Sequence, residues 1–162
     1  FGYGVVIFLI TFIGYLIPGI LAFLNTGFPF SPMIEETIKA GWGNGYQGFL
    51  NCMKDPIVHR EATTFAFTIL GIAELFHMLG MKNIKQSFLH VFQKGNGMLF
   101  LAFGLGFLRQ VLVTEIPGVT DIFKTVALSP LEWLFLCLIA LVVLLVHEIL
   151  VPVFRKRKSE II

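Results

Sequence analysis

Charged residues are scarce in this chain of 162 residues: they make up 14% of it, where an ordinary soluble domain has about 25%. Cysteine is nearly absent, since Cys52 and Cys137 are the only two, and this excludes a disulfide scaffold. The formal net charge of +2 is too small to indicate a nucleic-acid-binding surface. Hydrophobic residues reach 56% and lie in long runs instead of on one face of each element, so a water-soluble enzyme is excluded.

Four of these runs are long enough to cross about 30 Å of hydrocarbon as helices. The sequence predicts membrane spans over residues 3–24, 62–80, 96–113 and 131–154. We therefore expect an all-α membrane protein, a four-transmembrane-helix bundle with one long outer loop over residues 25–61. Residues 1–162 would form one membrane domain surrounded by the lipid bilayer. No nucleic acid is expected as a partner.

Basic residues predict how the bundle is oriented, because Lys and Arg accumulate on the cytoplasmic side of a membrane. With four spans, both chain ends and the loop after the second span lie on one side. That side has seven basic residues and the other has four, which are diluted by acidic residues. The two sets are Lys82, Lys85, Lys94, Arg155, Lys156, Arg157 and Lys158, against Lys39, Lys54, Arg60 and Lys124. Both ends are therefore predicted to be cytoplasmic.

The long outer loop carries signals of local structure. Ser31-Pro32 followed by Glu35-Glu36 is typical of a helix start, and Gly41 of a helix stop. Residues 41–48, which include Asn44-Gly45, indicate a turn-rich segment. At the start of the chain, no initiating Met and no soluble segment precede the first span. We expect the chain to be the end of a longer protein, cut at or just before a helix.

Several familiar site patterns are incomplete. His147-Glu148 begins a zinc-protease motif, but position 151 is Val where a second His is required. Gly104 and Gly106 lie inside a predicted span, so they indicate close approach of another helix instead of a phosphate-binding loop. Cys52 and Cys137 belong to separate segments and should not pair.

Glu74 stands out as a candidate functional residue. A carboxylate deep in a membrane helix costs about 2.5–3.5 kcal/mol on insertion scales, so it rarely persists without a partner or a task. His77 shares its helix face, as do Leu70 and Phe67. Calcium takes about six to eight oxygen ligands, of which one carboxylate supplies only a part. Glu74 could thus be one ligand of a cation site completed by other helices.

A structural role for Glu74 remains open at this point: it could pair with His77 or Arg109, or be protonated. Arg109 lies about a turn from the outer end of its span, and we expect it to extend outward to the interface. His147 and Glu148 are expected to anchor the inner end of the fourth helix at the interface.

Six short motifs give a resemblance to a known family, the P-type cation-transporting ATPases, and within it to the calcium-pump branch with its bacterial members. In order and spacing they resemble the eighth helix, the loop between the ninth and tenth helices, and the tenth helix. They are residues 62–67, 73–80, 115–117, 121–124, 128–133 and 147–150. The resemblance extends from about residue 60 to residue 155, and it implies that the chain is the C-terminal part, helices seven to ten, of such a pump.

The resemblance also implies roles for residues. Glu74 matches an acid that is a metal ligand of the transport site in calcium pumps, where helices four, five and six supply the other ligands. His77 stands where Asn is frequent and would lie beside that ligand. The implied transported ion is calcium, and the implied location is the bacterial plasma membrane as a multi-pass protein.

Other parts of such a pump have no counterpart in these 162 residues. These parts are the phosphorylated Asp, the nucleotide-binding domain and helices one to six. ATP and magnesium would bind to this missing part of the pump. The missing helices and the cytoplasmic domains would be the partners of this chain. The chain itself holds no catalytic or cofactor-binding residue and should be inactive alone. The alternative is a freestanding four-helix membrane protein, acting as a small channel or an assembly subunit.

Overall fold

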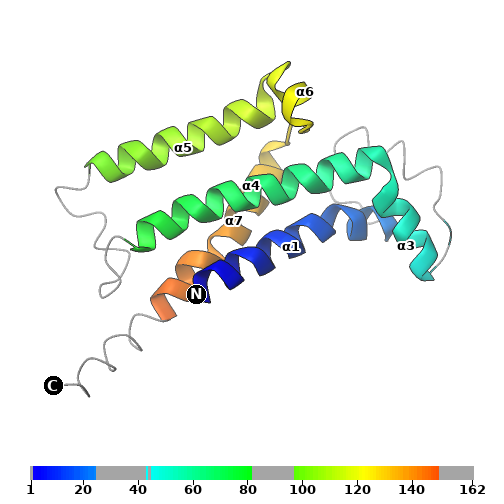
Figure 1. The fold of residues 1–162 in the computed structure, drawn as a ribbon, viewed down its shortest axis with the longest axis horizontal. Coiled ribbons are helices and arrows are strands. Elements are labelled where there is room, and N and C mark those ends of the chain that lie inside the picture. The colour runs from blue at the N-terminus through cyan, green and yellow to red at the C-terminus, as the bar shows by residue number, and fades with distance from the viewer. Residues whose placement is uncertain (1, 25–42, 44, 82–96, 150–162) are drawn as a thin grey trace.

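The computed structural model describes the chain except for residues 1, 25–42, 44, 82–96 and 150–162, and every regular element in the described part is a helix (Figure 1). The long helices are α1 (Gly2–Phe23), α4 (Pro56–Met81), α5 (Gly97–Glu115) and α7 (Pro130–Ala140). After a turn at Leu141, α7 continues as helix to residue 149. The short helices are α3 (Gly45–Lys54) and α6 (Val119–Phe123).

Four helices are long and apolar enough to cross a membrane: Tyr3–Phe23, Pro56–Met81, Gly97–Glu115 and Pro130–Ile149. The predicted all-α bundle with four spans is therefore confirmed. The first and third spans agree with prediction to within two residues at each end. The fourth was predicted to reach residue 154, and its last five residues lie outside the described part.

Helix α4 begins at Pro56, six residues before Ala62, where the second membrane span was predicted to start. The Oδ1 atom of Asp55 accepts hydrogen bonds from the backbone N–H groups of Ile57 at 2.9 Å and Val58 at 3.4 Å. Asp at the N-cap and Pro at the first helical position form a strong start signal. The prediction missed it because it counted apolar residues, and Arg60 and Glu61 interrupt that count. The predicted outer loop of residues 25–61 consequently ends at Asp55.

The predicted turn over residues 41–48 was wrong in its second half, where α3 begins at Gly45. Gly43 and Gly45 have positive φ angles of 88° and 67°, a conformation that glycine adopts at little cost. The predicted helix start at Ser31 lies outside the described residues.

The long helices lie side by side with alternating direction, and α4 is in the middle (Figure 1). α4 contacts α1, α5 and α7, and its contact with α1 is the most extensive. We call one end of the bundle, where α3 and α6 lie, the α6 end. The other end, where α1 and α5 begin and α4 finishes, is called the Tyr3 end.

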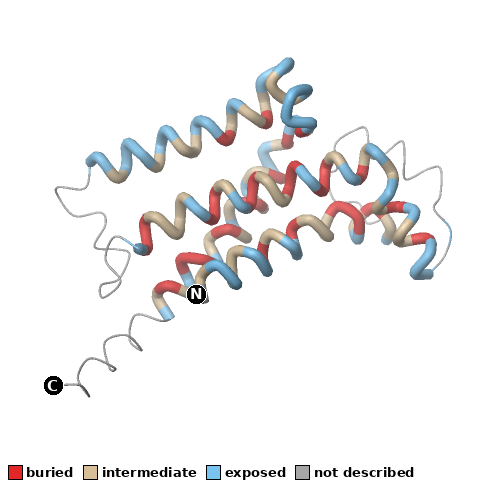
Figure 2. Tube along the Cα trace, viewed as in Figure 1, coloured by how far each residue is buried: buried red, intermediate tan, exposed pale blue. Residues whose placement is uncertain are grey.

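Burial follows this arrangement, since α4 is marked by buried residues along its length and α5 is exposed over most of its surface (Figure 2). The main core is made by apolar side chains of α1, α4, and α7 with its flanking residues. Its buried members are Ile10, Phe65, Ile69, Ile72, Ala73, Leu128, Leu136, Ala140 and Val143. Because lipid is as apolar as these side chains, close packing and hydrogen bonds hold such helices together.

At the α6 end, hydrogen bonds join the helices through the connecting segments. Glu115 Oε1 accepts from the backbone N–H of Leu128 at 3.1 Å and from Trp133 Nε1 at 2.9 Å, which ties the end of α5 to the start of α7. Ser129 and Glu132 form a capping box at the start of α7. The start of the fourth span is thus fixed by its polar residues.

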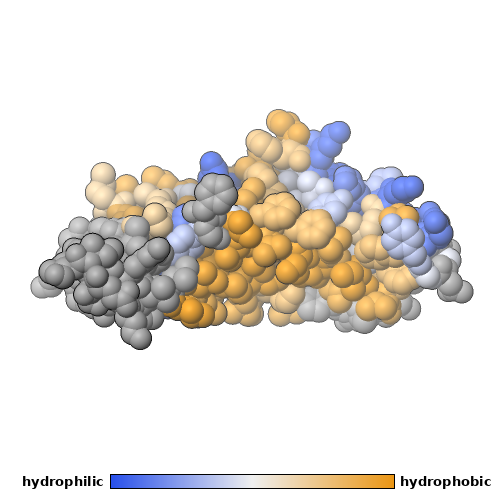
Figure 3. All heavy atoms as spheres, turned by 60° about the horizontal axis from the view of Figure 1, so that its bottom comes forward, coloured by the Kyte–Doolittle hydropathy of each residue, from blue (hydrophilic) through white to orange (hydrophobic). Residues whose placement is uncertain are grey.

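The outer surface of the bundle carries a broad apolar band, which Figure 3 shows over the middle of one face with hydrophilic residues towards the α6 end. Exposed large side chains on α1, α5 and α7 make up most of such surface, among them Phe8, Leu105 and Leu145 at 59–64% exposure. In a water-soluble protein this surface would aggregate, and in a bilayer it is the surface that lipid or other helices cover.

Candidate functional site

Glu74 lies on the open face of α4. The neighbouring Ile72 and Ala73 are fully buried in the core, whereas the Glu74 side chain is exposed. Leu70, one turn earlier on the same face, is 39% exposed, and Met81, two turns later, is 41% exposed. The face shared by these residues is therefore the part of α4 that α1, α5 and α7 leave uncovered.

Glu74 is not held by a neighbour within the described part of the chain. No hydrogen bond or ion pair connects it to any described residue, and the single described Lys or Arg ion pair with an acid is Arg60–Asp121. Two contacts set the register of α4 on α5: Gly71 faces Gln110, and Gly106 faces Leu75.

The same register bears on the alternative in which Arg109 neutralises Glu74. It places Glu74 and Arg109 within about 3 Å of each other along the helix axes, at the rise of 1.5 Å per residue. Even at this similar depth, no ion pair joins the two exposed side chains. The carboxylate is thus left with its oxygens available on the open face.

His77 shares the predicted face with Glu74 but turns towards α1. Its ring lies against Tyr3, with ring centroids 4.9 Å apart. The carboxylate of Glu74 and the ring of His147 are both near enough to act electrostatically on His77. His77 thus belongs to a group of aromatic and imidazole side chains at the Tyr3 end, together with Tyr3 and His147.

His147 was predicted to anchor the interface, and this was wrong. It is only 2% exposed, its Nδ1 lies 3.1 Å from the Tyr3 hydroxyl, and its ring packs against Gly80 of α4. The three helices α1, α4 and α7 therefore meet around His147. No local sequence pattern could predict this, because a contact between residues 3 and 147 follows from helix packing.

The described residues contain no group of three or more His, Cys, Asp and Glu side chains that could hold a metal ion. A carboxylate supplies at most two of the oxygens that a hard cation needs. Chemically, the open face of α4 offers one negative oxygen donor with an imidazole beside it. Such a face can contribute to a cation site only if other elements supply further oxygens.

Comparison with known families gives this geometry a context. Residues 1–152 match the family described as "Cation transporting ATPase, C-terminus". The chain belongs to this family. Its membership agrees with the predicted P-type ATPase resemblance, and the membrane-spanning helices make it an integral membrane protein.

Individual relatives of this cation ATPase C-terminal chain are calcium pumps by name. It is 30% identical over 97 residues to "Calcium-transporting ATPase 1" of Bacillus cereus, covering 60% of this chain and 11% of the relative. Over 100 residues it is 27% identical to "Calcium-transporting ATPase 1" of Yarrowia lipolytica, covering 62% and 11%. With "Calcium-transporting ATPase type 2C member 1" of Mus musculus, identity is 28% over 107 residues, covering 66% and 12%.

The chain therefore matches only 11–12% of the length of these curated relatives. No solved structure shows a significant match to this cation ATPase C-terminal chain. What the relatives' names say about calcium transport is a property of those whole proteins.

Proposed function

We propose that the chain is the membrane-embedded C-terminal part of an ATP-driven calcium pump, in which Glu74 lends one carboxylate oxygen donor to the transported ion. The observation that carries this proposal is the position of Glu74: an exposed, unpaired carboxylate on the open face of α4, about two turns before this membrane helix ends at Met81. Such a charge is costly in lipid, and a bound cation offsets that cost.

The rest of the pump would supply what this chain lacks. Further membrane helices would cover the open face of α4 and add oxygen ligands, because about six to eight are needed for calcium. ATP, magnesium and the phosphorylated aspartate would belong to cytoplasmic domains outside this chain. These helices and domains are the proposed partners of the chain.

The second proposed task is to brace the helices that move. The core between α1, α4 and α7 is closely packed, and the segment between α5 and α7 is tied by Glu115. A packed block of this kind moves as a unit, so alternating access would come from other helices shifting against it. We further propose that both ends of the chain are cytoplasmic and that the pump lies in a bacterial plasma membrane.

A test of the ligand role is Glu74→Gln in the complete pump that contains this chain. The amide keeps the size of the side chain but removes its negative charge. We expect the apparent calcium affinity of phosphoenzyme formation to fall about tenfold or more, equivalent to at least about 1.4 kcal/mol. Phosphorylation by inorganic phosphate, which does not require bound calcium, should be largely retained.

Asp121→Asn is the matched control, since Asp121 is an 80% exposed carboxylate at the α6 end, far along the chain from Glu74. This variant should leave calcium dependence unchanged. If Glu74→Gln also left it unchanged, Glu74 would be a structural group and the ligand role would be wrong.

The reading frame upstream of Phe1 distinguishes the pump from a freestanding four-helix subunit. Several hundred codons that encode an Asp-Lys-Thr-Gly-Thr motif would support the pump. A start codon immediately before Phe1 would contradict it.

A further inference from the structure

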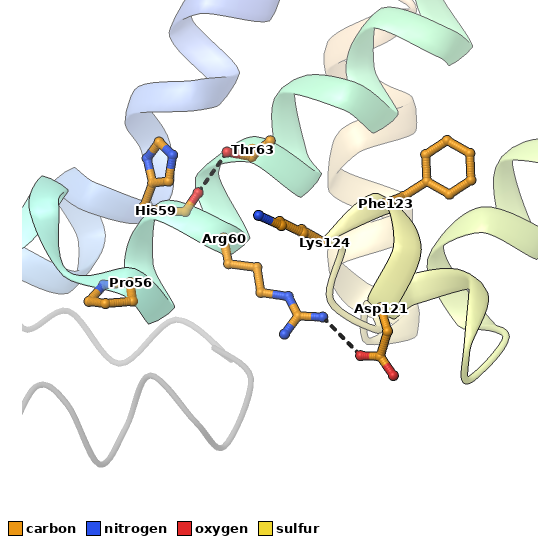
Figure 4. Close-up of a pocket in the computed structure, with 7 residues that line it drawn as sticks. All are labelled: Pro56, His59, Arg60, Thr63, Asp121, Phe123 and Lys124. Carbon is orange, nitrogen blue, oxygen red and sulfur yellow. Dashed lines mark hydrogen bonds and ion pairs between the residues drawn. The ribbon is translucent and has the colours of Figure 1, made fainter.

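A cavity of about 570 Å³ lies at the α6 end, where α4 begins and α6 ends (Figure 4). His59, Arg60 and Thr63 of α4 line one side, and Asp121, Phe123 and Lys124 line the other. Two of the candidate spans have a terminus at this level: Pro56–Met81 begins here, and Gly97–Glu115 finishes here. The cavity is therefore at the level where lipid headgroups meet the hydrocarbon core.

The cavity has more hydrogen-bond donors than acceptors. Arg60 gives its Nε–H to the carbonyl of Thr125 at 3.0 Å and its Nη2 to the carbonyl of Thr120 and to Asp121, each at 3.5 Å. Its Nη1 and the ammonium group of Lys124 have no acceptor among the residues that the structure describes. Figure 4 shows the end of the Lys124 side chain directed back towards His59 and Arg60.

The remaining polar groups of the lining leave this excess in place. The Nδ1 of His59 and the Tyr15 hydroxyl form a hydrogen bond of 3.0 Å. Thr63 donates its hydroxyl to the carbonyl of His59 at 2.8 Å. Asp121 is the one carboxylate in the lining, and its side chain is 80% exposed. With His59 counted as neutral, the cations Arg60 and Lys124 and the anion Asp121 give the lining a formal net charge of +1.

The guanidinium of Arg60 is held in place before any ligand binds, whereas for Lys124 only the backbone conformation is defined. Arg60 is fixed by the two backbone carbonyls, and Lys124 ends α6 with the left-handed φ angle of 53°. Donors that are already ordered lose little conformational freedom on binding. The group that matches them is a small oxyanion with a single negative charge and acceptor oxygens only, such as a phosphate diester.

A second cavity of about 390 Å³ adjoins the first and shares Pro56 and Arg60 with it. Apart from Arg60 its lining is small or apolar, with Ile57, Val126 and Ala127 among its residues. Phe123, which lines the first cavity, is 53% exposed, and the preceding residue of α6, Ile122, is 77% exposed. A cationic compartment joined to an apolar one, with exposed apolar side chains beside both, suits an amphiphile better than a free ion.

We propose that this cavity binds the phosphate diester of an anionic membrane phospholipid, with Arg60 and Lys124 as its donors. The site is separate from Glu74, and binding here does not require calcium transport. The bound lipid would join α4 to the α6 segment at the edge of the bilayer.

The test measures binding of phosphatidylglycerol to the complete pump by native mass spectrometry after titration of the lipid into detergent. Lys124→Asn removes the ammonium group, and Asn is among the residues that tolerate the left-handed conformation. We expect it to weaken the tightest binding step about fivefold, the effect typical of one basic residue near an anionic headgroup. Lys54→Asn is the matched control: Lys54 is an exposed lysine at the same end and outside the cavity, and its loss should change little.

Two further arms complete the design. Asp121→Asn removes the competing acceptor and should strengthen binding. Excess inorganic phosphate should not displace the lipid. If it did, and if lipid-free protein bound inorganic phosphate in a Lys124-dependent manner, a free anion would be the ligand and the lipid source would be wrong. Equal weakening by Lys124→Asn and Lys54→Asn would overturn the site altogether.

Discussion

Cys52 shows how strongly position controls the chemistry of one residue. It is fully buried between α3 and α1, and its Sγ contacts the backbone carbonyl of Gly19 at 3.6 Å. Burial, and secondarily the negative charge of Asp55, raises the pKa of this thiol to about 11. Both causes act in the same direction, because each disfavours the thiolate.

The thiolate is the reactive form, so we predict that Cys52 resists alkylation in the complete pump. A rise of about two pKa units lowers the thiolate fraction about 100-fold at neutral pH. Reaction with iodoacetamide should accelerate as the pH rises towards 11, and it should become fast at neutral pH after unfolding. Peptide mass spectrometry would quantify the label, with an Ile122→Cys variant as the exposed reference. Equal rates for the two thiols would show that water reaches Cys52.

The candidate residues differ in how far sequence could predict them. Glu74 was predictable, because a carboxylate inside an apolar span is costly wherever the helix lies. Its exposure and its lack of an ion pair with Arg109 were not, since both depend on the register of α4 against α5. His147 was misplaced for a related reason: its environment is made by Tyr3 and Gly80, which are distant from it along the chain.

The contact between α4 and α5 depends on one of two nearby glycines. A Cβ atom at Gly106 would press on the Leu75 side chain, whereas one at Gly104 would meet nothing within 4 Å. Both glycines were predicted to allow another helix to approach closely, and among the described residues the structure confirms this for Gly106 alone. The two have the same helix propensity and lie on the same helix, so they form a matched pair.

We predict that Gly106→Leu destabilises the complete pump and that Gly104→Leu does not. Overpacking at a filled contact costs about 1–3 kcal/mol, while a leucine at Gly104 has open space and better helix propensity than glycine. The thermal midpoint of the purified pump, followed by size-exclusion chromatography after heating, gives the comparison. If both variants lost the same stability, Leu75 would not lie against Gly106.

Element boundaries show where sequence reading succeeds and fails. The spans were found because about 20 apolar residues in a row have few alternatives to a membrane helix. The start of α4 was missed because polar residues occupy its first turns, where Asp55 and the hydrogen bonds of Arg60 to the α6 segment decide the structure. The membrane sets the apolar middle of each helix, and local capping sets its ends.

Taken whole, the molecule is unevenly covered. α4 is enclosed on three sides, yet α5 buries only Gln110 and Thr114. This asymmetry fits a block that meets further helices or lipid on its α5 side and on the open face of α4. The direction in which the block crosses the membrane follows from the charge distribution alone, and it is open to a direct test.

We predict that the α6 end faces the outside of the cell and the start of α5 faces the cytoplasm. Met98 and Ile122 are suitable reporters, because they are 81% and 77% exposed and lie at opposite ends of α5 and its adjoining segment. The 19 residues of α5 extend for about 28 Å, which separates these ends by roughly the hydrocarbon thickness. In intact cells, a membrane-impermeant maleimide should label the Ile122→Cys variant and leave the Met98→Cys variant unlabelled. Inside-out vesicles should reverse the pattern. This reversal also controls for poor reactivity of either position. The opposite result in both preparations would invert the orientation predicted from the lysines and arginines.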